Sequence, residues 1–240
     1  MRHKMELSIH LDGSDSILAI PRRHFAEQGS WIATLARPWL PDSPHRQDPR
    51  KVGLSLATRL DPTFSADRIF FDPDPLLAAL EQSRPGEIYY LEDVVLSVAG
   101  LPQFSRTFAS PIKTLLAAVR RHGVGLLLAA QGEDQTLVRP LCDRRDSVII
   151  TYDDLGYETL HEAFPHLPED ILVATWYEST GIPLPGFSLR RTEAPVIGGR
   201  TVTGVIMPQP PADLLAACQA MAEAYLEGRY RRLVKTGKGV

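Results

Sequence analysis

Two apolar segments that end in polar residues constrain the fold of this chain most strongly. Residues 88–91 are apolar and are followed at once by Glu92 and Asp93, and the apolar residues 124–130 are followed by Gln131. Between these segments, residues 108–119 carry apolar side chains at helical spacing. A strand, a helix and a second continuous apolar strand indicate a parallel sheet that is covered on both faces.

The rest of the first 168 residues continues this alternation. We expect an edge strand at 5–11, a buried strand at 31–36, a short strand at 67–71 and a continuous apolar strand at 148–152. Helices are expected at 51–60, 72–80 and 153–163. Asp72 followed by Pro73 is typical of a capped helix start, because proline at the first position removes no needed hydrogen bond. The pattern predicts an α/β fold with a mainly parallel sheet flanked by helices.

The character of the chain changes after residue 168. Strands are expected at 171–177, 187–191 and 201–207, separated by Pro/Gly turns, and a helix is expected from Pro211 to Arg229. The segment is too short to bury much apolar surface alone. We therefore predict one domain over residues 1–228, in which 168–228 form a C-terminal β extension with a terminal helix, followed by a basic tail at 229–240.

Composition narrows the functional classes. The chain has 240 residues, a formal net charge of −3 and two cysteines without metal-ligand spacing. No disulfide framework or zinc site is expected. No run approaches the roughly 20 apolar residues of a membrane span, and the N-terminus lacks a signal-peptide pattern. These features predict a cytoplasmic protein without a membrane segment.

Several segments together resemble the P-loop ATPases of the HerA/FtsK superfamily, especially the small archaeal, viral or plasmid-borne branch that includes packaging and Zot-like ATPases. The resemblance covers about residues 30–228 and depends on the order of its segments. It is carried by residues 31–36, 54–64, 67–72, 85–93, 120–131, 208–215 and 224–227.

The resemblance implies a RecA-like core, hexameric rings and ATP-driven movement of double-stranded DNA. It would place Glu92 at the position of the acid that holds Mg²⁺ and Asp93 at the position of the acid that activates water. Gln131 would be the phosphate sensor, and Arg50 or Lys51 would lie near the family's nucleotide-binding lysine. The family's usual order is Asp then Glu, so both acids are changed here.

The expected phosphate-binding loop departs from the family. Residues 37–51 contain no glycine, and prolines stand at 38, 41, 44 and 49. The G-x-x-x-x-G-K-S/T pattern needs glycines because its backbone closely surrounds the phosphates, and prolines remove N–H donors. Arg50 and Lys51 would still place positive charge at a helix N-terminus, so ATP and Mg²⁺ stay as candidate cofactors. We expect hydrolysis to be absent rather than present.

Two groups of basic residues have alternative interpretations. The first is Arg139, Arg144 and Arg145, which either supply a trans-acting arginine finger or form salt bridges with Asp143 and Asp146. The second is Arg229, Arg231, Arg232 and Lys235, which either contact a DNA backbone or form a solvated tail.

Three functions therefore follow from the sequence. The first is a degenerate ATPase-fold protein that acts as an accessory or structural subunit of a DNA translocation, packaging or mobile-element system. Its partners would be double-stranded DNA, further copies of itself or an active ATPase. The second is an active but atypical DNA-translocating ATPase. The third is a RecA-fold module that binds another protein and neither nucleotide nor DNA.

Overall fold

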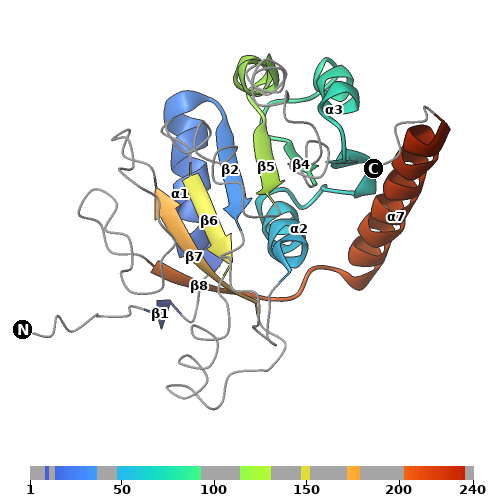
Figure 1. Cartoon of the computed structure of the whole chain (residues 1–240). Coiled ribbons are helices and arrows are strands. Elements are labelled where there is room, and N and C mark those ends of the chain that lie inside the picture. The colour runs from blue at the N-terminus through green and yellow to red at the C-terminus, as the bar shows by residue number, and fades with distance from the viewer. Residues whose placement is uncertain are drawn as a thin grey trace, which may run out of the picture.

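One eight-stranded sheet organises the protein (Figure 1). The computed structural model describes residues 9–10, 14–36, 48–92, 114–130, 147–151, 172–178 and 203–235. The strand order is β1-β8-β7-β6-β2-β5-β4-β3. The strands are β1 Ile9–His10, β2 Trp31–Ala36, β3 Ile69–Phe70, β4 Ile88–Leu91, β5 Gly125–Ala130, β6 Ser147–Thr151, β7 Leu172–Glu178 and β8 Thr203–Met207.

The five strands β6-β2-β5-β4-β3 form a continuous parallel block. Strand β5 lies between β2 and β4: Gly125 is in register with Trp31 on one side and with Ile88 on the other. The predicted parallel sheet that contains residues 31, 88 and 126 is thus confirmed. The protein has a RecA-like α/β fold.

Side chains alternate between the two faces of this block, as the pleat of a strand requires. Tyr90 and Ile88 of β4 lie in one buried cluster together with Leu35 and Leu127. Tyr89 and Leu91 lie in the other cluster. Because both faces are apolar, both must be covered by helices.

Different helices cover the two faces. Helices α2 (Pro49–Leu60) and α7 (Ala212–Lys235) contribute to the Tyr90 cluster, and α7 lies beside α2 at the β3–β4 end of the sheet (Figure 1). Helix α3 (Pro73–Leu80) and the helix at 114–122 contribute to the Tyr89 cluster. The fold is three-layered, and α2 packs on the face to which Tyr90 of β4 points.

A glycine sets the distance between α2 and the sheet. A Cβ atom on Gly53 would lie 2.5 Å from Cε2 of Tyr90 and 2.6 Å from Cδ1 of Leu35. Both distances are too short for carbon atoms that are not bonded. A side chain at position 53 would therefore move α2 away from β4 and change the position of the first turn of α2.

The predicted C-terminal extension belongs to the same sheet. Strand β7 is antiparallel to β6, and β8 is antiparallel to β7. Strand β1 pairs in parallel with β8 and forms one edge of the sheet, as the alternation at 5–11 predicted. A connector at residues 208–211 then leads to α7, and the hydroxyl of Ser55 donates to the carbonyl of Pro208 at 2.7 Å.

Several element predictions were wrong in detail. Helix α1 (Ser14–Gln28) was not predicted, and it contains Pro21, a residue that normally disfavours a helix interior. Helix α2 begins at Pro49 rather than Lys51, and α7 continues to Lys235, so most of the predicted basic tail is helical. The strand expected at 187–191 and the helix expected at 153–163 lie outside the described residues.

A buried ion pair fixes the start of β4. The carboxylate of Asp61, the residue directly after α2, accepts hydrogen bonds from the guanidinium of Arg68, from the backbone N–H of Ile88 and from Thr63. Burial works to raise the pKa of Asp61, but the hydrogen bonds from Thr63, Arg68 and Ile88 hold that pKa below its ordinary value of 3.8. This network ties α2 and β4 together.

Among the described residues, no helix has both the length and the apolar composition that crossing a membrane requires.

Candidate functional site

The site lies where β4 ends and α2 begins. Glu92 directly follows β4 and has the same parity as Ile88 and Tyr90, so its side chain points to the face that α2 covers. Its exposed fraction is only 1%. A carboxylate so deeply buried needs a charged or hydrogen-bonding partner.

Arg50 supplies that partner from the first turn of α2. Its Nε donates to Oε1 of Glu92 at 2.8 Å, and its Nη2 lies 2.7 Å from the same oxygen. The side chain of Arg50 is 18% exposed, against 1% for Glu92. Burial works to lower the pKa of Arg50, but the hydrogen bond and the charge of Glu92 raise that pKa above its ordinary value. The guanidinium of Arg50 is therefore positively charged.

Asp48 occupies the N-terminus of α2. Its side chain accepts a hydrogen bond from the backbone N–H of Arg50 at 2.9 Å. Pro49, the first residue of the helix, has no N–H to offer. A helix N-terminus carries partial positive charge and attracts anions. Here an anion from the chain itself already holds that position.

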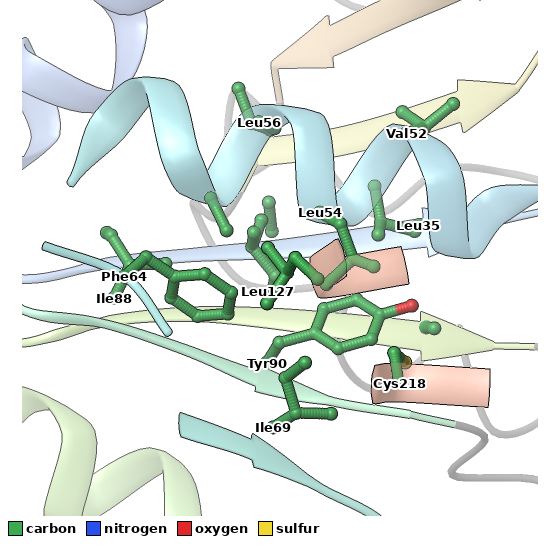
Figure 2. Packing of buried hydrophobic residues seen from close by; sticks show 14 of the residues in the cluster. Leu35, Val52, Leu54, Leu56, Phe64, Ile69, Ile88, Tyr90, Leu127 and Cys218 are labelled. Atoms are coloured by element: carbon green, nitrogen blue, oxygen red, sulfur yellow. The ribbon is translucent and has the colours of Figure 1, made fainter. Parts of the chain in front are cut away.

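Tyr90 and Cys218 approach the pair from the interior. Figure 2 shows Cys218 of α7 beside the hydroxyl end of the Tyr90 ring, and both residues are fully buried. Burial raises the pKa of Tyr90 well above its usual value, and the carboxylate of Glu92 raises it further. Burial likewise raises the pKa of the Cys218 thiol to about 12; Glu92 adds to this shift and Arg50 opposes it. Both groups are therefore neutral at physiological pH.

The structure brings together some of the predicted site residues and leaves others untested. Arg50 and Glu92 lie together, and Lys51 follows on α2 as a half-buried residue. Asp93, Gln131 and the arginine-finger candidates Arg139, Arg144 and Arg145 lie outside the described residues. In α7, the exposed side chain of Arg231 pairs with Glu227 one turn earlier. Residues 229, 232 and 235 are on the same helix, but their side chains are outside the described part of the structure.

Three residues of this site were not predicted from the sequence. Asp48 precedes a proline just as Asp72 does, and both carboxylates accept a hydrogen bond from the backbone N–H two residues later. The Asp-Pro pattern could therefore have predicted Asp48 as a helix cap. Tyr90 belongs to the apolar run 88–91, and Cys218 lies within the helix that was expected from Pro211 to Arg229. No sequence pattern distinguishes them from other core residues.

No family model and no curated protein matches this sequence. Within the described ranges, no three potential metal-ligating side chains are grouped together. The chemistry of the site therefore has to be inferred from its own geometry.

Proposed function

We propose that this chain is a degenerate member of the HerA/FtsK-type ATPases that keeps the RecA-like fold and does not hydrolyse ATP. It acts as an accessory or structural subunit of a cytoplasmic DNA translocation or packaging system. The observation that supports this proposal most strongly is the buried pair of Arg50 and Glu92, because the resemblance gives these residues to ATP and Mg²⁺.

The described part of the site does not fit a magnesium ion. In the family, the acid at the end of this strand would hold a divalent cation. In this chain, the guanidinium of Arg50 is within hydrogen-bond distance of Oε1 of Glu92, so a protein cation already neutralises the carboxylate. Magnesium binding would have to displace a buried and charged hydrogen bond, which is costly. The proposed function therefore includes no metal-dependent step.

The start of α2 is equally unsuited to a phosphate. Asp48 places a carboxylate at the helix N-terminus, where it would repel a phosphate and compete for the N–H of Arg50. Pro49 removes a donor, and the preceding residues 37–48 contain no glycine. Arg50 could not neutralise a phosphate without giving up Glu92. In this proposal, Asp48 takes the place of the phosphate at the helix N-terminus, and Arg50 takes the place of the metal ion beside Glu92.

A subunit with such a site contributes to the structure of an assembly and not to ATP hydrolysis. The fold of the family that the chain resembles supports assembly into rings. The basic residues of α7, of which Arg231 is exposed, support contact with a DNA backbone. We propose double-stranded DNA and either further copies of the chain or an active ATPase as its partners.

Two assays on the full chain test the proposal together. The melting temperature with and without Mg-ATP should be unchanged, since a ligand that does not bind the folded state gives no stabilisation. Phosphate release should equal that of a Glu92→Gln variant, in which any family-type metal site is disabled. A large stabilisation by Mg-ATP, with turnover that the Glu92→Gln variant lacks, would instead favour the active ATPase.

A further inference from the structure

Helix α7 packs on the rest of the protein through a narrow stripe. Among the α7 side chains that the structure describes, those of Leu214, Cys218 and Ala222 are buried, each four positions from the next, and those of Leu215 and Met221 are partly buried beside them. The alanines at 216, 220 and 224 are exposed. By contrast, the shorter helix α2 fully buries four apolar side chains, those of Val52, Leu54, Leu56 and Ala57. Because hydrophobic stabilisation follows the apolar area buried, the described side chains of α7 hold that helix less strongly than those of α2 hold α2.

Two further attachments of α7 lie at separate places. At its start, Ser55 of α2 holds the carbonyl of Pro208 in the connector. Further along, the ring of Tyr225 stacks on Phe71 with a centroid distance of 5.5 Å. The Ser55–Pro208 bond holds the connector rather than the helix itself. The Tyr225–Phe71 stack is therefore an attachment whose loss would weaken the docking of α7 without altering the connector.

The sequence of α7 favours a helix even without tertiary contacts. It spans 24 residues and is rich in alanine, leucine, glutamate and arginine, which have high helix propensity. Isolated helices shorter than about 12–15 residues are marginal even when they are rich in such residues, and α7 exceeds that length. Leaving the sheet would therefore not require α7 to unfold.

We propose that α7 is a strap that opens as an intact helix, while the connector stays attached to α2, and that its opening uncovers the site. Cys218 lies beside the hydroxyl end of Tyr90. The charges of Glu92 and Arg50 both act on its thiol, so its departure would admit solvent to the interior side of that pair. The strap would control access to the site from the side that α7 covers. This inference depends on the packing of α7 and holds whether or not the chain hydrolyses ATP.

The reactivity of Cys218 provides the test. In the full chain with Cys142 replaced by serine, the rate at which a thiol reagent labels Cys218 is measured at increasing urea concentrations below the unfolding transition. A buried thiol reacts only from an open state. The proposal predicts labelling that is faster than global unfolding allows and that depends on urea less steeply than global unfolding does. Labelling with the same urea dependence as global unfolding would overturn it.

Two variants and a second measurement distinguish the opening of α7 from global unfolding. Tyr225→Ala should accelerate labelling about tenfold beyond any change in global unfolding, since the aromatic stack stabilises the closed state alone. Leu226→Ala, an exposed neighbour on the same helix, should leave the rate unchanged. Hydrogen exchange should give the amides of α7 a larger free energy of opening than the labelling of Cys218 gives. The absence of acceleration in Tyr225→Ala, or the same free energy of opening for the amides and for Cys218, would contradict a strap that opens as an intact helix.

Discussion

Arg50 and Glu92 are 42 residues apart in sequence, yet their side chains form a buried charged hydrogen bond of 2.8 Å that joins the start of α2 to the end of β4. The bond gives a charged partner to Oε1 of a carboxylate that is almost completely shielded from water. It also uses the two groups that a nucleotide site of this fold would need for its phosphate and its metal. A substitution at either residue is therefore expected to affect both the stability of the protein and the properties of the site.

Removing one partner of the pair should destabilise the protein strongly. Arg50→Met leaves the Glu92 carboxylate buried without its cation and is expected to lower the free energy of unfolding by about 2–4 kcal/mol, the lower part of the range reflecting the partial exposure of Arg50. Urea denaturation measures the change. The double variant Arg50→Met/Glu92→Leu should lose less than the sum of the two single variants.

The exposed pair Arg231 and Glu227 serves as the control for that cycle. Both side chains are largely in solvent, so Arg231→Met should change the free energy of unfolding by less than about 1 kcal/mol. If the Arg50 and Glu92 substitutions were equally mild and additive, the buried pair would not hold α2 to β4.

Gly53→Ala tests whether the close approach of α2 is required. Alanine favours a helix over glycine by about 1 kcal/mol, but the new Cβ would meet Tyr90 and Leu35, and overpacking of this kind costs about 1–3 kcal/mol. We expect net destabilisation in urea denaturation. Gly228→Ala in α7 is the matched control, because no atom lies within 4 Å of its added Cβ. The control should be neutral or stabilising; a stabilised Gly53→Ala would contradict the close packing of α2 on β4.

Asp61 should make stability sensitive to acid. Its folded-state pKa lies below its ordinary value of 3.8, so the unfolded chain binds its proton more readily. The stabilisation is therefore fully present above that ordinary value and is lost as the pH falls through the lowered folded-state pKa. Urea denaturation across this acidic range should show a steeper loss for the native chain than for Asp61→Asn. Parallel pH profiles for the two proteins would contradict this role.

The basic residues of α7 should contribute to DNA binding in a salt-dependent way. Replacing Arg229, Arg231, Arg232 and Lys235 by alanine is expected to weaken duplex binding. The slope of log affinity against log salt should also become shallower, by about 0.9 for each DNA phosphate that the variant no longer neutralises. Fluorescence anisotropy at several salt concentrations measures both quantities. Replacing the exposed Arg84 and Arg121 on other elements is the control. An equal effect in both variants would assign the binding to general charge.

The central strands were predictable because their apolar runs need cover on both faces. Residues 31–36, 88–91 and 124–130 have that character, and the structure places them side by side. Helix α1 was not predictable in the same way, since Pro21 lies within it and the proline rule points to a helix end. The extension of α7 past residue 229 was missed because a cluster of charges resembles a tail in sequence.

Arg50 and Glu92 could be singled out from the sequence, but their pairing could not be predicted. Glu92 ends an apolar strand and Arg50 begins a helix, so both stood out in the sequence. Their contact depends on how closely α2 approaches β4, which Gly53 permits, and no local pattern encodes a distance between elements. Two residues that were expected to bind a nucleotide and a metal therefore bind each other in the structure.

A crystal structure determined with Mg²⁺ and a non-hydrolysable ATP analogue tests the central claim most directly. We predict that Nε of Arg50 still donates to Glu92 at a distance near 2.8 Å, with Asp48 on the α2 N-terminus and no nucleotide beside it. A triphosphate at that N-terminus, with Arg50 turned toward it and a metal ion near Glu92, would contradict the claim that the chain's own side chains occupy the nucleotide site.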